Sequence, residues 1–99
     1  MEASFQFLRN FSDQKLIYGI NTGFGPMAQY KVSAENVLQL QYNLIRSHSS
    51  GSGNYLSPAL VKALMLARLN SLMQAHSGVH TDVAVVLKEL INNNITPCI

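Results

Sequence analysis

The chain is short, weakly charged and rich in apolar residues. It has 99 residues, of which 47% are hydrophobic and only 12% are charged, and its net charge is +2. This length suffices for one small domain that buries about two thirds of its unfolded surface, and so low a charge fits a surface that further chain covers. The lysines and arginines are scattered, which argues against a nucleic-acid binder, and no apolar run approaches the roughly 20 residues that span a membrane.

The start of the chain and its single cysteine bear on location. Residues 1–5 contain no basic segment followed by a long apolar run, so nothing there is typical of a signal peptide. One cysteine, Cys98, excludes an intramolecular disulfide and fits a reducing compartment. We therefore expect the cytoplasm. Cys98 is expected to be a buried small residue rather than a nucleophile, because no activating base is identifiable beside it.

The first third of the chain predicts one short helix and one long loop. Apolar residues between positions 5 and 11 predict the helix, which Ser12-Asp13 ends. Residues 15–18 are expected to run extended into a loop that contains three glycines and continues to about Lys31.

Three longer helices are expected after the loop. Apolar residues at helical spacing predict them over residues 33–48, 57–76 and 81–92. Ser33 and Ser57 are candidate N-caps, and Pro58 suits the first helical position because its missing amide has no intrahelical partner there. Residues 1–99 are thus expected to form a single, mainly α domain with little or no strand, in which these three helices pack on one another.

The segment YGINTGFG at residues 18–25 is the strongest candidate for chemistry. It places Tyr18 directly before a loop whose glycines allow backbone angles and close ligand approach that other residues do not. A phenol held there could act as an acid or a base on a movable loop. The alternative from the residues alone is a plain turn with a packing tyrosine. A phosphate-binding loop is disfavoured, because the spacing G-x-G-x-x-G is absent.

Several motifs, taken in order, resemble the N-terminal part of the aromatic amino acid ammonia-lyases. They are YGINTGFG at 18–25, QLQYNL at 39–44, SHSSGSG at 47–53, RLNSL at 68–72 and HSGV at 76–79. The resemblance extends from about Ser4 to Ile99, but it covers only a minor front portion of a family enzyme. It implies a fragment, truncated at both ends, of the aspartase/fumarase-like all-α lyase fold.

The resemblance also implies a cofactor that these residues do not supply. Family members form an electrophilic methylidene-imidazolone ring (MIO) from an internal Ala-Ser-Gly triad, and residues 1–99 contain no such triad. Ser49-Ser50-Gly51 is similar in composition, but it stands where the family has its substrate-recognition segment, so we reject it as a precursor. No cofactor is expected in the fragment, and the fragment alone is expected to be inactive.

The resemblance assigns roles to five residues. Tyr18 matches the family's catalytic base, and His48 and Ser47 match the segment that lies against the substrate side chain. Read from the residues alone, His48 is a helix-terminal cation that the helix dipole favours. Asn21 and Gly25 are further candidates for substrate binding, although a role in shaping the loop is more expected for both.

The histidines do not predict a metal site. His48, His76 and His80 lack the spacing of a zinc site, with each other or with Cys98. His80 stands where the family commonly has arginine, so the resemblance carries no role over to it.

The pair Ser47-His48 resembles the histidine-specific branch of the family, since tyrosine-specific members carry histidine one position earlier and phenylalanine-specific members have apolar residues there. The sequence therefore predicts the front part of a histidine ammonia-lyase, an enzyme of histidine catabolism that converts L-histidine to urocanate and ammonia. The alternatives are a fragment of a tyrosine or phenylalanine ammonia-lyase or aminomutase, or a noncatalytic self-associating module. Family enzymes are tetramers, and we expect the fragment to self-associate through its apolar helix faces and to bind neither nucleic acid nor membrane.

Overall fold

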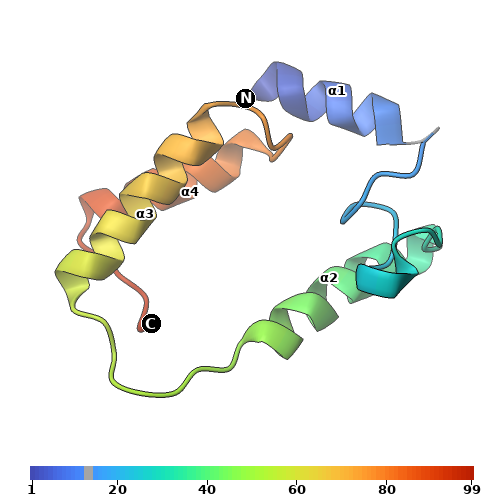
Figure 1. The fold of residues 1–99 in the computed structure, drawn as a ribbon. Coiled ribbons are helices and arrows are strands. Elements are labelled where there is room, and N and C mark those ends of the chain that lie inside the picture. Colours follow the sequence, from blue (N-terminus) through green and yellow to red (C-terminus); the bar gives the residue numbers. More distant parts are fainter. Residues whose placement is uncertain (13–14) are drawn as a thin grey trace. The chain divides into compact units, whose positions relative to one another are not determined.

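The computed structural model describes residues 1–12 and 15–99 and is mainly helical (Figure 1). Its elements in chain order are α1 (Glu2–Ser12), the 3-10 helix η1 (Gly25–Met27), α2 (Ala34–His48), α3 (Pro58–Met73) and α4 (Thr81–Asn92). Within the described residues, β-structure is limited to one isolated antiparallel bridge between Thr22 and Lys31. The prediction of a mainly α fold with little or no strand is confirmed.

The described chain groups into two compact units. The first comprises residues 1–9 and 52–99, and contains α3, α4 and most of α1. The second comprises residues 10–51, and contains the glycine-containing loop and α2. All five candidate site residues belong to the second unit. That residues 1–99 form a single domain stays a prediction, as does the packing of α2 on the other helices.

Short polar residues define where the helices begin. Ser57 caps α3 as predicted, because its side chain accepts a hydrogen bond from the Leu60 amide. Ser33 precedes α2 as predicted, but its hydroxyl accepts from the Asn36 side chain rather than from a backbone amide. The N-cap of α4 is His80, whose Nδ1 accepts from the Asp82 amide at 3.2 Å. Histidine is rare as an N-cap, so the sequence pattern indicated that the helix begins at Thr81 but did not identify His80 as its cap. The first helix begins at Glu2, earlier than expected, and ends at Ser12, the first residue of the predicted end Ser12-Asp13. Asp13 lies outside the described residues.

Helix α3 ends at Met73, before the position near residue 76 that the sequence indicated. Ala75 adopts a left-handed backbone with φ of 63°, and its amide donates to the Leu72 carbonyl at 3.0 Å. A β-carbon is unfavourable in this conformation, which is why the pattern pointed to Gly78 instead. Gly78 has a packing role: a β-carbon there would lie 2.5 Å from Leu8 Cδ2 of α1. This glycine therefore lets α1 lie against the connection between α3 and α4.

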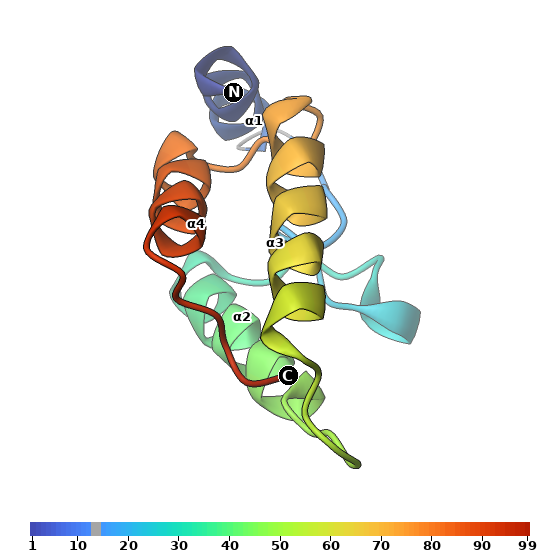
Figure 2. The same ribbon diagram turned by 90° about the vertical axis from the view of Figure 1, so that its left-hand side faces the viewer.

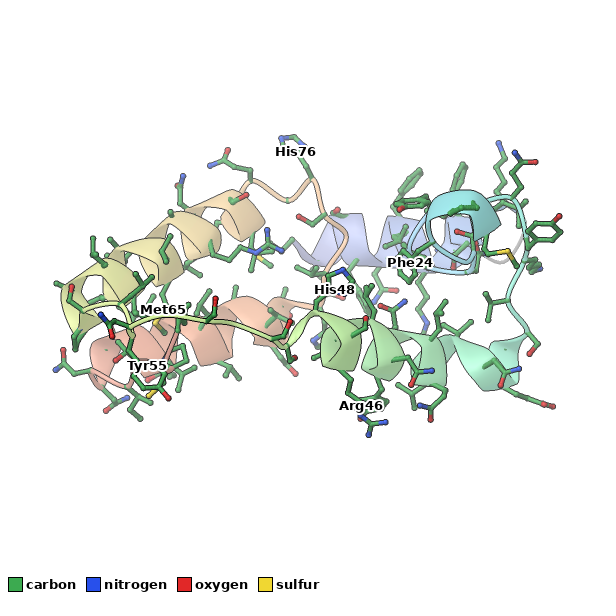
Figure 3. The ribbon with its side chains drawn as sticks, turned by 60° about the horizontal axis from the view of Figure 1, so that its bottom comes forward. Phe24, Arg46, His48, Tyr55, Met65 and His76 are labelled. Carbon is green, nitrogen blue, oxygen red and sulfur yellow. The ribbon has the colours of Figure 1, made fainter. Side chains whose placement is uncertain are left out.

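The packing of α3 against α4 forms the core of the first unit. The two helices lie side by side in both views (Figure 1, Figure 2). Val61, Met65 and Leu72 of α3 are buried, together with Ala84 of α4, and Met65 lies where the two helices meet (Figure 3). The three α3 residues follow helical spacing along one stripe, and the short side chain of Ala84 allows close approach.

Three apolar side chains of α3 that helical spacing assigns to its buried side are exposed. They are Leu60, Leu64 and Met73, and Val83 and Val86 of α4 are exposed as well. A helix that packs on one neighbour buries one stripe, whereas α3 carries apolar residues around most of its circumference. The prediction of burial was therefore wrong for Leu60, Leu64 and Met73, and the five exposed residues leave an apolar surface on the first unit.

The chain end also differs from expectation. Cys98 is exposed, not buried. It lies beyond α4 in a segment whose backbone is held to the residues before α3, since the Leu56 amide donates to the Ile99 carbonyl at 2.7 Å. None of the helices in the described part of the chain is long and apolar enough to cross a membrane.

Candidate functional site

The glycine-containing loop of the second unit closes on itself as a hairpin-like structure. The bridge between Thr22 and Lys31 joins its two arms, supported by the Gly23 amide donating to the Tyr30 carbonyl and the Val32 amide donating to the Asn21 carbonyl. The turn of η1 lies between the arms. The prediction that the loop extends to about Lys31 is confirmed, and its ends are held together by backbone hydrogen bonds.

Tyr18 lies on the outside of a tight turn at the start of this loop. The Ile17 carbonyl accepts hydrogen bonds from the amides of Ile20 and Asn21, so the chain turns at Tyr18 rather than continuing as the expected extended segment. Gly19 makes the turn possible with a φ of 78°. The Tyr18 side chain is 64% exposed, and its ring contacts that of Phe24 edge-on with centroids 5.8 Å apart. The phenol is therefore accessible to a ligand, and its ring contact comes from the same loop.

The side chain of Asn21 ties the loop to the chain before it. Asn21 is 9% exposed, and its Oδ1 accepts from the Ile17 amide at 2.7 Å. Its Nδ2 donates to the carbonyls of Ser12 and Lys15, both at 2.8 Å. Both amide hydrogens are thus occupied inside the protein. This geometry favours loop shaping over substrate contact for Asn21.

Replacing Asn21 tests that interpretation. We expect Asn21→Ala to destabilise residues 1–99 by about 2–3 kcal/mol, because a net contribution of about 1 kcal/mol per hydrogen bond is lost at three partners. Urea denaturation followed by circular dichroism measures the loss. Asn43→Ala is the matched control, since Asn43 is exposed on α2 and bonds only Gln39 among the described residues. Equal stability of the two variants would show that the Asn21 contacts contribute nothing.

The glycines of the loop have different roles. A β-carbon on Gly23 would lie 2.7 Å from both the β-carbon and the carbonyl oxygen of Met27, so only glycine lets η1 fold against the loop. Gly25, the glycine that the resemblance singled out, has a φ of 55° and no heavy atom within 4 Å of a built β-carbon. Gly23 is therefore the loop glycine that close packing requires. Substrate contact by Gly25 stays a prediction.

Helix α2 contacts the loop through Gln41, a residue for which the sequence predicted no role. Its Nε2 donates to the Gly19 carbonyl at 3.0 Å across 22 residues of sequence. One feature of the sequence could have identified Gln41: it is a polar residue on the otherwise apolar stripe of α2, between Val37 and Leu44. His48 follows Gln41 by about two turns, so it lies on the same face of α2, about 10 Å along the helix. The loop that carries Tyr18 and the side chain of His48 thus lie on one side of α2.

The hydrogen bonds of His48 indicate its tautomer. Nδ1 lies 2.9 Å from the Leu44 carbonyl oxygen and 3.0 Å from the Ser47 hydroxyl, which itself donates to the same carbonyl. A carbonyl oxygen only accepts, so Nδ1 carries the hydrogen, and Nε2 of the neutral ring is left as an acceptor. His48 and Arg46 point to opposite sides of α2 (Figure 3), and Arg46 lies over the Tyr42 ring. His48 is an exposed residue, so Nε2 is available to a hydrogen-bond donor on a ligand.

Metal ligands do not gather in the structure. Across residues 1–12 and 15–99, no three side chains of histidine, cysteine, aspartate or glutamate are placed to hold a metal ion.

Comparison with known protein sequences places these features in one family. The profile described as "Aromatic amino acid lyase" matches residues 1–99. The histidine ammonia-lyase of Shouchella clausii is 45% identical over 87 residues, which are 88% of this chain and 17% of that protein. A probable histidine ammonia-lyase of Thermoplasma volcanium is 42% identical over 94 residues, 95% of this chain and 19% of that protein. The chain therefore spans less than a fifth of the length of these relatives.

Solved structures agree with the sequence comparison. The tyrosine aminomutase of Streptomyces globisporus is 36% identical with a TM-score of 0.90, over 98% of this chain and 19% of that one. The phenylalanine aminomutase of Pantoea agglomerans is 35% identical with a TM-score of 0.79 over the same shares. With a family profile that matches from the first residue to the last, and relatives above 40% identity, this chain belongs to the aromatic amino acid lyase family.

Proposed function

We propose that residues 1–99 form the N-terminal part of a histidine ammonia-lyase, which converts L-histidine to urocanate and ammonia. The observation that carries the proposal is His48 at the end of α2, with its Nε2 available as an acceptor on the face that holds the Tyr18 loop. An imidazole side chain of the substrate offers an N–H donor to this acceptor, whereas a phenyl ring offers none. Relatives 41–45% identical that carry the name histidine ammonia-lyase support the same choice.

The chemistry that we propose for this segment is the removal of one proton. The Tyr18 oxygen takes a proton from the β-carbon of the substrate, and the electrons of that C–H bond form the double bond to the α-carbon. The C–N bond of the protonated amino group breaks with its electron pair on nitrogen, which leaves as ammonia. His48 holds the imidazole ring through Nε2, which orients the β-carbon toward Tyr18. Ser47 supports this contact, because its hydroxyl lies against His48 Nδ1.

The complete reaction needs an electrophile for the amino group. We propose the MIO ring of the family for this role, formed from an Ala-Ser-Gly triad elsewhere in a complete lyase. Residues 1–99 hold no such triad, so none of the steps assigned to Tyr18, His48 or Ser47 passes through the ring. The absence of a membrane-spanning helix in the described residues and the single cysteine are compatible with the cytoplasm, which we keep as the proposed location.

The second candidate is a tyrosine or phenylalanine lyase or aminomutase. It is supported by the two aminomutase structures, whose fold this chain shares at 35–36% identity. The order Ser47-His48 argues against it, because the tyrosine-specific branch that the motifs resemble has histidine one position earlier.

A hybrid enzyme tests the proposed function. Residues 1–99 replace the matching segment of the Shouchella clausii histidine ammonia-lyase, and the absorbance of urocanate is followed with L-histidine as substrate. We expect the hybrid to form urocanate, and the 99-residue chain alone to form none, because it contains no Ala-Ser-Gly. A hybrid with the helical content of the parent that acts on tyrosine or phenylalanine, but not on histidine, would support the second candidate. A folded hybrid inactive on all three substrates would contradict both.

Self-association of the isolated chain is a separate expectation. Leu38, Tyr42 and Ile45 form a stripe on α2, and their side chains are 65%, 51% and 64% exposed. Such a stripe favours assembly in water, at roughly 25 cal/mol per Å² of apolar surface removed from solvent. We expect light scattering across a dilution series to show a dimer or larger species, and Ile45→Glu to shift it toward monomer, while Asn43→Glu does not. A strict monomer at high micromolar concentration would contradict this expectation.

A further inference from the structure

The two residues next to Tyr18 in the chain each have one backbone group held by a side-chain amide. On one side, the Ile17 amide donates to Asn21 Oδ1 at 2.7 Å. On the other side, the Gly19 carbonyl accepts from Gln41 Nε2 at 3.0 Å. Asn21 belongs to the loop itself, whereas Gln41 belongs to α2. The backbone on both sides of the proposed base is therefore anchored, once within the loop and once to a helix.

The tie to the helix matters because packing does little to hold Tyr18. Its side chain is 64% exposed, and its ring contact is with Phe24, which moves with the same loop. Gly19, the next residue, has a φ of 78° and no side chain of its own to anchor the turn. The hydrogen bond from Gln41 joins this turn to the helix that ends at His48. It thus sets the distance between the group that removes a proton and the group that binds the substrate ring.

We infer that Gln41 is a positioning residue for Tyr18, acting through the Gly19 carbonyl and touching no substrate. The inference rests on the proposed function, because it assumes that the Tyr18 phenol reacts. Misplacing a catalytic group by about 1 Å costs on the order of 100-fold in rate. Loss of one anchor should therefore lower kcat about 10- to 100-fold and change KM little, since the ring-binding residue His48 stays in place.

Three replacements of Gln41 distinguish the effect of its N–H donor from the effect of its side-chain volume. Gln41→Leu and Gln41→Glu remove the N–H donor, and the second keeps the shape of the side chain. Gln41→Lys keeps a donor that can reach the carbonyl. In the hybrid lyase we expect kcat to fall with Leu and Glu and to be largely retained with Lys. Gln39→Leu on the same helix is the control, because Gln39 is exposed and donates to Asn43. A requirement for packing volume alone would instead spare the Glu variant.

A double-mutant cycle with Tyr18→Phe distinguishes positioning from general support of the fold. A positioning residue acts only through the phenol, so Gln41→Leu should have no further effect on kcat when Tyr18 is already phenylalanine. A structural role predicts the same loss in both backgrounds and would overturn the inference. If Tyr18→Phe itself keeps full activity, the proposed function fails. If Tyr18→Phe is impaired and Gln41→Leu is not, the positioning inference fails alone.

A measurement on the 99-residue chain tests the same contact without activity. Tyr18 is replaced by 3-fluorotyrosine, and its fluorine resonance is recorded in the parent chain, in Gln41→Leu and in Gln39→Leu. We expect the resonance to move toward that of free fluorotyrosine in Gln41→Leu, because the turn loses its anchor, and to stay unchanged in Gln39→Leu. An identical resonance in all three chains would show that Gln41 does not position Tyr18, and the inference would be overturned.

Discussion

Tyr18→Phe in the hybrid lyase is expected to lower the rate of urocanate formation by about 10²- to 10⁴-fold, the usual contribution of a general base. The substitution removes the hydroxyl and keeps the ring, so the edge-on contact with Phe24 is preserved. The fold should be unaffected, because the Tyr18 side chain is 64% exposed. Steady-state kinetics with L-histidine, together with circular dichroism of the variant, measure both parts of the expectation.

Tyr30→Phe is the matched control for this experiment. Tyr30 lies in the same loop, its side chain is 63% exposed, and its backbone carbonyl keeps its hydrogen bond with Gly23 after the substitution. We expect this variant to retain nearly the full rate. Near-normal turnover in Tyr18→Phe would remove Tyr18 from the mechanism, whereas equal losses in both variants would indicate a general effect of tyrosine hydroxyls on the loop.

The second large effect is expected at His48. The structure leaves Nε2 as the outward acceptor, while Nδ1 is used by the Leu44 carbonyl. A glutamine side chain places its terminal amide near the position of Nε2, whereas an asparagine side chain reaches only the position of Nδ1. We therefore expect His48→Asn to lower kcat/KM for histidine about 10- to 100-fold, the loss expected for one unpaired hydrogen bond. His48→Gln should retain more activity than His48→Asn in the same assay.

Exchange of the pair tests specificity directly. Replacing Ser47-His48 by His-Leu moves the histidine one position toward the start of the chain, and we expect the ratio of histidine to tyrosine turnover to fall. The ratio, rather than either rate alone, is the measurement, because a general loss of stability lowers both rates together. An unchanged ratio would show that the contacts which choose the substrate lie outside residues 1–99.

The sequence by itself determined the helices and the motifs. The Ser57-Pro58 start of α3 follows from local chemistry, because both effects act within one helical turn. The Ser57 hydroxyl accepts from the Leu60 amide, and Pro58 has no amide that needs a partner. The limits of α2 and α4 follow from apolar spacing in the same way. The motifs around Tyr18 and His48 indicated the family without any knowledge of their contacts.

The early end of α3 and the identity of the exposed apolar side chains were decided by the tertiary structure. Ala75 takes a left-handed conformation that its sequence disfavours, and Leu8 of α1 occupies the space beside Gly78. Leu60 and Leu64 look like core residues in the sequence, but α3 buries one stripe, with Val61, Met65 and Leu72. Periodicity shows that a helix has an apolar face, but the neighbour that covers the face comes from elsewhere in the chain.

The arrangement of the candidate site also needed the tertiary structure. Sequence motifs identified Tyr18 and His48 separately, while the hydrogen bond from Gln41 to the Gly19 carbonyl joins positions 22 residues apart. Asn21 was a substrate-binding candidate in the sequence, and its three hydrogen bonds show it holding the loop. A side-chain amide can bond any backbone group within its reach, so its partner is set by which segments folding brings together, not by the residues beside it in the sequence.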